Sequence, residues 1–300
     1  MTPSLLNLPQ ELRDFIIEHA LISTSRPPPI HSRTGEATEE LQDIDYVSRS
    51  QGRGIHYLNG KHQTSAFGLL LANQQIHNET KAAISRLSSA GTKYTMDLIL
   101  ENEEFLNPTW TFVPPLTRTV DAFEVTFRIF GTANNETNGF MDVDGSTGST
   151  IWRLYSVLER FMRCGALAAR SPAEDRRLRL KVLYLNILTP STNSETTLAP
   201  DDISPDKLPL HRKETDPHNQ ILHPEALAKF MYVWVAGILR LGDPTYALPG
   251  TPVAKYAKLF FERIEDIKIA VDGENMFHID VVEMAREIRE KNEWFSSSIV

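Results

Sequence analysis

The chain has 300 residues, of which 41% are hydrophobic and 23% are charged, and its formal net charge is −8. These values are typical of a globular protein with a substantial core and exclude a disordered or fibrous chain. The negative charge repels phosphate backbones, so a nucleic-acid partner is not expected.

The cysteine content and the length of the apolar runs indicate the cellular compartment. Cys164 is the only cysteine, so no internal disulfide can form, which indicates a reducing environment. The first residues lack the basic region of a signal peptide, and the longest apolar run, residues 230–239, is too short to cross a bilayer. We therefore expect an intracellular protein, cytoplasmic, nuclear or both, with no membrane partner.

Residues 1–90 are predicted to form a helical segment with a long polar insert. Pro9 is suited to the start of a helix, and the apolar spacing continues to about Ile22. The insert, residues 23–63, shows no sustained periodicity and is expected to be a long, partly disordered loop. A second helix is predicted over residues 66–88.

Residues 91–300 are predicted to form an α/β body. Alternating apolar residues predict strands at 92–100, 118–130, 178–188 and 267–271, and helical spacing predicts helices at 150–170, 223–241, 252–263 and 280–295. Flexible loops are expected at 131–149 and 189–222. This order favours an α/β class, with mixed α+β as the alternative: N-terminal helices on a mixed sheet of about four strands covered by helices.

Three segments carry partial signals for ligand chemistry. Residues 142–145 begin like a calcium loop, but the position of its final glutamate is Arg153. The glycine-rich residues 145–150 lack the lysine of a phosphate-binding loop, and capping of the next helix accounts for them better. Three histidines, His211, His218 and His223, share one polar loop without a ligand spacing. With no catalytic motif present, we predict no catalytic residue, no metal site and no cofactor.

The first helix has an unusually wide apolar arc. At about 100° per residue, Leu12, Phe15, Ile16 and Ile22 cover one sector, and Ile17, Ala20 and Leu21 continue around the helix. The polar side consists only of Glu11, Asp14 and Glu18. Such a helix is either almost surrounded by its own domain or leaves one apolar sector for a partner.

The opening segment, Leu5-Leu6-Asn7-Leu8-Pro9-Gln10-Glu11-Leu12-Arg13-Asp14-Phe15-Ile16, resembles the degenerate F-box of filamentous-fungal proteins. Residues 69–80, with the sequence LLLANQQIHNET, resemble the helix that follows in such proteins, and the resemblance extends over about residues 5–130. About forty polar residues separate the two helices here, whereas an ordinary F-box is continuous.

This resemblance implies a non-enzymatic protein-interaction adaptor that docks on a Skp1-like protein in a cullin-type ubiquitin ligase and binds an unknown client. The positions matching the docking motif are Leu8, Pro9, Leu12 and Ile16, followed by Leu70, Leu71 and Ile76 in the second segment. Two alternatives stay open: a fungal structural or interaction protein without a ligase role, and an enzyme with a site near residues 131–149.

Overall fold

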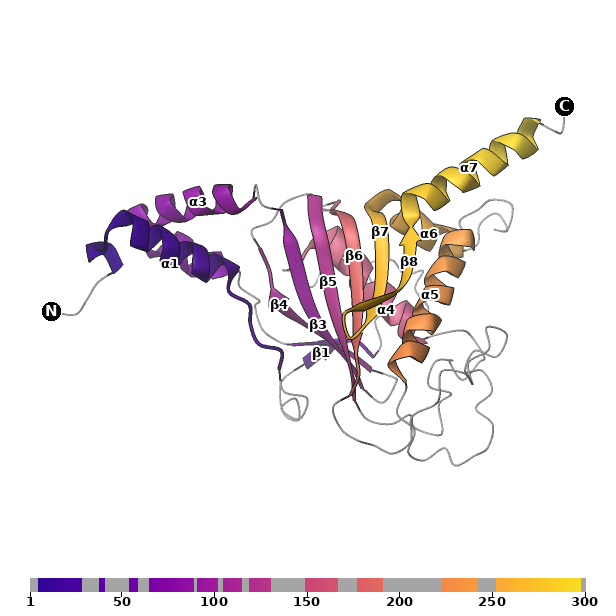
Figure 1. Cartoon of the computed structure of the whole chain (residues 1–300), viewed down its shortest axis with the longest axis horizontal. Helices are drawn as coiled ribbons and strands as arrows, with labels where there is room; N and C mark the ends of the chain where they lie inside the picture. Colours follow the sequence, from indigo (N-terminus) through magenta and orange to yellow (C-terminus); the bar gives the residue numbers. More distant parts are fainter. Residues whose placement is uncertain are drawn as a thin grey trace.

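A six-stranded mixed sheet forms the centre of the molecule (Figure 1). This computed structural model describes residues 5–28, 38–40, 54–58, 65–88, 91–101, 105–114, 119–130, 149–166, 177–190, 223–241 and 252–297. The strands are β3 (Lys93–Glu101), β4 (Phe105–Phe112), β5 (Thr119–Phe130), β6 (Arg179–Leu188), β7 (Ile264–Val271) and β8 (Glu274–Asp280), in the order β4-β3-β5-β6-β7-β8. Neighbours from β3 to β7 are parallel, and the two edge strands are antiparallel to their neighbours.

The helices are α1 (Gln10–Ile22), α2 (Ser65–Ala72), α3 (Gln74–Ser88), α4 (Ser149–Cys164), α5 (Pro224–Leu241), α6 (Pro252–Arg263) and α7 (Val281–Ser297), and a short 3₁₀ turn (Leu5–Asn7) precedes α1. Side chains of α4, α5 and α6 join one core with the sheet face that carries Phe123, Phe127 and Leu185. The rings of Phe123 and Phe161 lie 4.3 Å apart at the centre of this core. Because aromatic side chains bury large areas, this layer is the main apolar mass of the fold.

The predicted mixed α/β class is confirmed, but the sheet has six strands instead of the four expected. A proline usually interrupts a strand, but Pro108 lies inside β4, an edge strand, where a missing N–H is tolerated. Asp272 and Gly273 lie between β7 and β8. Both have positive φ values, 49° and 86°, the geometry of a tight hairpin turn that leads into β8.

The predicted helices are present, with two changes of boundary. Residues 66–88 form two helices, because Asn73 interrupts them and its side-chain oxygen accepts a 2.9 Å hydrogen bond from the N–H of Ile76. The fourth helix ends at Cys164, well before the expected residue 170. Gly165, with φ of 78°, follows as a left-handed cap, and its N–H donates to the carbonyl of Phe161 at 2.7 Å.

Part of the polar insert, which was expected to be a long, partly disordered loop, forms two short strands and contacts the sheet. Strands β1 (Thr38–Glu40) and β2 (His56–Leu58) pair with each other, and Ile55 forms a bridge with Leu106 of β4 and is buried in the main core. Gly54 has φ of 74°, and a Cβ atom there would lie 2.6 Å from Nε of Arg153. Of the two other expected loops, residues 131–148 and 191–222 lie outside the described residues.

The chain leaving α1 is attached to the sheet at two points. The N–H of Ser25 donates to the carbonyl of Thr111 on β4 at 2.7 Å. Farther along, the guanidinium of Arg128 donates to the carbonyl of Pro28 at 2.8 Å and pairs with the buried carboxylate of Asp97 at 2.5 Å. Residues 23–28 therefore connect the N-terminal helices to the β4 side of the sheet, as Figure 1 shows.

Candidate partner-binding site

Helices α1, α2 and α3 have an apolar core of their own, and we call residues 5–22 and 65–88 the helical module. Its buried members are Ile17, Leu21, Ala66, Ile76 and Ala83, and none of them belongs to the core of the sheet. In Figure 1 the module extends from the β4 edge of the sheet instead of covering a face. Most of the module's surface is therefore not covered by the rest of the described chain.

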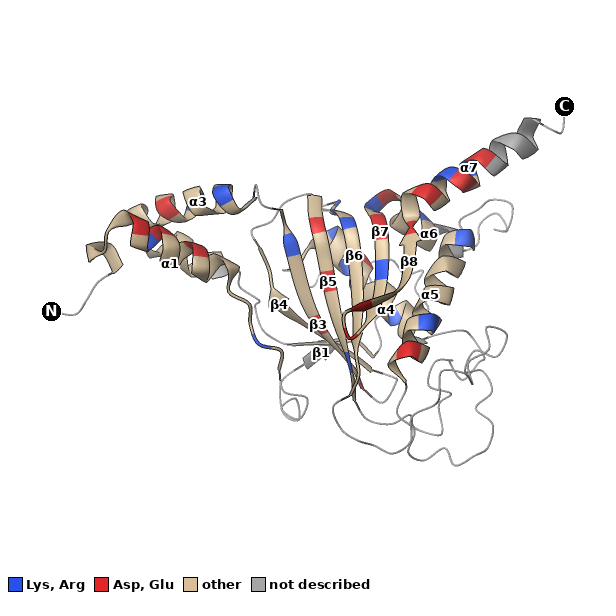
Figure 2. Ribbon diagram, in the orientation of Figure 1, with Lys and Arg blue, Asp and Glu red and all other residues tan. Residues whose placement is uncertain are grey.

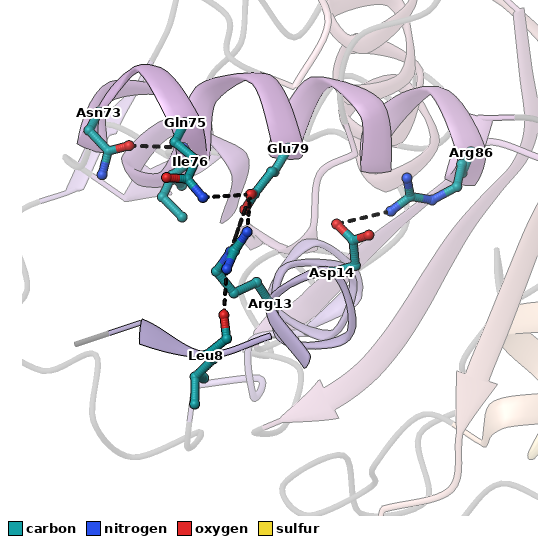
Figure 3. A network of polar contacts seen from close by, with 8 residues as sticks. All are labelled: Leu8, Arg13, Asp14, Asn73, Gln75, Ile76, Glu79 and Arg86. Atoms are coloured by element: carbon teal, nitrogen blue, oxygen red, sulfur yellow. Dashed lines mark hydrogen bonds and ion pairs between the residues drawn. The ribbon is translucent and has the colours of Figure 1, made fainter. Parts of the chain in front are cut away.

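A buried arginine joins the two longer helices of the module (Figure 3). Arg13 of α1 donates through Nε and Nη2 to the carboxylate of Glu79 on α3, with a shortest distance of 2.7 Å. Its Nη1 donates to the carbonyl of Leu8 at 2.5 Å, and Gln75 donates to Glu79 at 3.0 Å. Because a guanidinium binds a carboxylate in a fork geometry, this contact orients α1 on α3 as well as attracting it.

The same contact shifts the pKa values of both partners. The hydrogen bond from Arg13 is the main cause that lowers the pKa of Glu79 below its usual value, and the hydrogen bond to Glu79 raises the pKa of Arg13. Both side chains therefore remain charged, which favours the paired geometry. Leu8, directly before Pro9, is held at the entrance of α1 by this arginine.

A second ion pair lies nearer the other end of α3. Arg86 pairs with Glu18 at 2.8 Å and with Asp14 at 3.6 Å, and all three side chains are partly exposed. The two acidic residues belong to the polar side of α1, and Figure 3 shows the contact between Asp14 and Arg86. Exposed pairs of this kind contribute little free energy, and Arg13 and the apolar core are the main contacts between the helices.

The apolar arc of α1 divides into an inner and an outer sector. Ile17 and Leu21 point inward and are 0% and 2% exposed. The outer sector, which we call the exposed apolar face, consists of Leu12, Phe15, Ile16 and Ile22, with exposed fractions of 51%, 59%, 42% and 48%. The ring of His19 lies 4.3 Å from that of Phe15 and extends this face. The first helix is therefore not almost surrounded by its own domain, because one apolar sector is exposed.

Exposed apolar residues concentrate on the module. Among the described residues, nine large apolar side chains are exposed, and seven of them belong to the module: Leu6, Leu12, Phe15, Ile16, Ile22, Phe67 and Leu71. Single exposed apolar residues need no explanation, but a concentration of them on one part of a molecule is typical of an interaction surface.

The predicted partner-binding residues fall into three groups. Pro9, Leu12, Ile16 and Leu71 are exposed, with Leu71 the most exposed of all large apolar residues described, at 69%. Leu8 and Leu70 are half-buried. Ile76 is buried in the module's core, where it supports α3 from inside and does not reach the surface.

Sequence reasoning missed four members of this surface: Leu6, Phe15, Ile22 and Phe67. The helical wheel placed Phe15 and Ile22 in the same sector as Leu12 and Ile16, so the signal for them was present. The predicted docking residues were those that match the F-box-like motif, and Phe15 and Ile22 are not among the matching positions. For Phe67, a helix of eight residues offers too short a pattern to distinguish the inner from the outer side.

Only some residues of the other candidate sites lie among the described residues. Residues 142–148, His211 and His218 lie outside the described residues, while His223 directly precedes α5, where its Nδ1 accepts from the N–H of Glu225 at 3.3 Å. Within the described ranges, no group of three or more His, Cys, Asp or Glu side chains is placed to hold a metal ion.

Helix α5 is the most apolar of the longer helices, with charged residues only near its two ends (Figure 2). No helix among the described residues has both the length and the apolar character needed to span a membrane.

Comparisons of the chain with family profiles, with curated proteins and with solved structures find no match.

Proposed function

We propose that this chain is a non-enzymatic protein-interaction adaptor that docks through its helical module. The exposed apolar face of α1 is the observation that supports this proposal most directly. By the resemblance of residues 5–16 and 69–80 to fungal F-box segments, the docking partner is a Skp1-like protein of a cullin-type ubiquitin ligase. The α/β body would then hold the client protein.

The architecture of the module suits such a role. The inner sector of α1 and the Arg13–Glu79 contact hold the helix in place, so the outer sector is presented without a folding step. A pre-organised surface loses less entropy on binding than one that must order first. Aromatic side chains such as Phe15 are enriched at the centre of protein interfaces, and a cluster of exposed apolar side chains is typical of an interaction surface.

A pull-down with purified Skp1 tests the proposal. We expect the full chain to be captured, and we expect Leu12→Asp and Ile16→Asp each to weaken capture by about thirtyfold or more, which corresponds to roughly 2 kcal/mol for an anchor residue. Val282→Asp on α7 is the matched control, because Val282 is as exposed as Phe15 but lies outside the module. This control should bind like the unmodified chain.

Two outcomes would reject the ligase role: no capture of Skp1 by the folded chain, or capture that Leu12→Asp and Val282→Asp affect equally. Circular dichroism of each variant verifies the fold. Since Leu12 and Ile16 are exposed, their replacement by aspartate leaves the core of the module unchanged.

A further inference from the structure

Two described segments of backbone connect the helical module to the sheet. One is residues 23–28, which leave α1 on the β4 side, and the other is Gly91 and Thr92, which lead into β3 (Figure 1). The buried cores of the module and of the sheet share no residue. Because no shared core fixes the orientation of the module, the contacts of these two segments decide how it is held.

An arginine of the sheet holds the end of the first segment. Arg128 of β5 donates from Nη2 to the carbonyl of Pro28 at 2.8 Å. The same guanidinium donates to both carboxylate oxygens of Asp97 on β3, at 2.6 and 2.5 Å, and Asp97 is only 1% exposed. A buried charge is costly unless it is paired and hydrogen-bonded. Asp97 therefore fixes the guanidinium in a position from which it also reaches the carbonyl of Pro28.

A second hydrogen bond holds the same segment three residues earlier. The N–H of Ser25 donates to the carbonyl of Thr111 on β4 at 2.7 Å. Pro27 and Pro28 follow, and their rings fix the backbone φ angle, which makes this short segment stiff. We call the two hydrogen bonds, from Ser25 to Thr111 and from Arg128 to Pro28, the latch. Both act on one stiff piece of backbone at the end of α1.

The other segment, which leads into β3, contains a residue suited to rotation. Thr92 is bonded to the sheet, because its N–H donates to Oδ2 of Asp121 at 2.6 Å and its carbonyl accepts from the N–H of Asp121 at 2.8 Å. Gly91, directly before it, has φ of 105°, a conformation that residues with a side chain rarely adopt. Because glycine has a wide range of backbone angles, a change at Gly91 rotates α3 while the bonds of Thr92 stay intact.

We propose that the helical module is a hinged arm with its pivot at Gly91, and that the latch holds it in the orientation of Figure 1. Each hydrogen bond contributes little net free energy, so the latch opens without unfolding the module or the sheet. Opening changes the direction of the exposed apolar face relative to the body. This device goes beyond the proposed adaptor role and holds for any partner of that face.

Distances between spin labels in the full chain, measured by double electron–electron resonance, test the latch. One pair of labels, at Ser85→Cys on α3 and Lys258→Cys on α6, reports the position of the module relative to the body, and both side chains are exposed. A second pair, at Ser85→Cys and the exposed Gln10→Cys on α1, reports the module itself. Cys164→Ala removes the only native thiol from every sample.

We expect one narrow distance distribution for each pair of labels when the latch is intact. Ser25→Pro removes the N–H that donates to Thr111. Arg128→Lys keeps a cation beside Asp97 but loses the forked donor that also reaches Pro28. The two changes together should broaden the module–body distribution by about twofold or more and leave the distribution within the module unchanged, because a released module turns as a rigid body.

Two control variants should give the distributions of the intact latch. Ser25→Ala keeps the N–H, and Lys268→Met on β7 removes a cation that pairs with Asp266 at 3.6 Å, outside the latch. A broad module–body distribution with the latch intact, or a narrow one in the double variant, would overturn the proposal. Broadening of both label pairs would also overturn it, because the module would then unfold instead of turning.

The pivot is tested by adding Gly91→Ala to the double variant. A side chain is strained at φ of 105°, so once the latch is lost the backbone should leave this conformation. We expect the mean distance between module and body to shift, whereas an unshifted mean would contradict a pivot at Gly91.

Discussion

The helical module and the sheet body use their apolar residues in opposite ways. In the body, phenylalanine, leucine and isoleucine side chains from the sheet and from helices α4, α5 and α6 form one core. Few large apolar residues are exposed among the described residues of the body. In the module, five buried residues form the core, while a larger number of leucine, isoleucine and phenylalanine side chains point outward. The same residue types therefore stabilise the fold in one region and are available for binding in the other.

This difference has a consequence for stability. A small core gives little net free energy of folding, so the module depends on polar contacts such as Arg13–Glu79 and on its attachment through residues 23–28. The body does not need such help. We infer that the module unfolds at milder conditions than the sheet, as regions with few buried contacts generally do.

Phe123→Ala in the body should have the largest effect. Phe123 is fully buried and its ring lies 4.3 Å from Phe161 and 5.5 Å from Trp110, so its truncation leaves a large cavity. We expect the body to lose about 3–5 kcal/mol of unfolding free energy. Urea unfolding followed by tryptophan fluorescence measures this loss, since all four tryptophans follow residue 90. A loss below 1 kcal/mol would show that the sheet core does not dominate the body's stability.

Ile17→Ala should have a smaller and local effect. Ile17 is buried in the module's core, and its truncation should cost about 2–4 kcal/mol. Because the two cores are separate, we expect the part of the helical circular dichroism signal that comes from α1–α3 to be lost at lower urea, while the tryptophan transition stays unchanged.

Ile16→Ala is the matched control for this change, because the neighbouring isoleucine is exposed and should shift the helical transition by less than about 0.5 kcal/mol. If Ile17→Ala shifts the tryptophan transition as much as it shifts the helical one, while Ile16→Ala shifts neither, the module and the body unfold as one unit. The comparison between two separate cores would then be wrong.

The fold was largely predictable from the sequence. The errors arose at residues that are compatible with two different local structures. A proline inside a strand pattern usually ends it, but Pro108 lies on a sheet edge, and a sequence does not tell which strand will be at the edge. The Asp272-Gly273 pair is a common hairpin signal, but β8 has mostly exposed residues and shows no clear apolar alternation. Asn73 was predicted inside a helix and instead begins a new one.

The candidate site was predictable only in outline. The wheel showed that the apolar arc of α1 was too wide, but the choice between inner and outer sectors depends on where α3 lies. Arg13 decides this, because its contact with Glu79, 66 positions later, turns Ile17 inward and Leu12 outward. Such a long-range partner could not be selected from the many glutamates in the sequence.

The smallest expected effect is a pH dependence confined to the module. Arg13 lowers the pKa of Glu79 from its ordinary value of 4.5, so the ionised carboxylate favours the folded state. Its contribution is complete above pH 4.5 and is lost as the pH falls from there through the lowered pKa. The urea midpoint of the helical transition should therefore decrease in acid, and the profile of Glu79→Gln should be lower near pH 7 and flatter below it.

Glu274→Gln on β8 removes a carboxylate from the body and serves as the control for that profile. Its helical transition should follow the unmodified chain at every pH, because Glu274 does not contact the module. If Glu79→Gln has a profile as steep as the unmodified chain, Arg13 does not hold α1 through Glu79. The inward position of Ile17 would then depend on apolar packing alone, and the outer sector would be free to turn toward the module's own core.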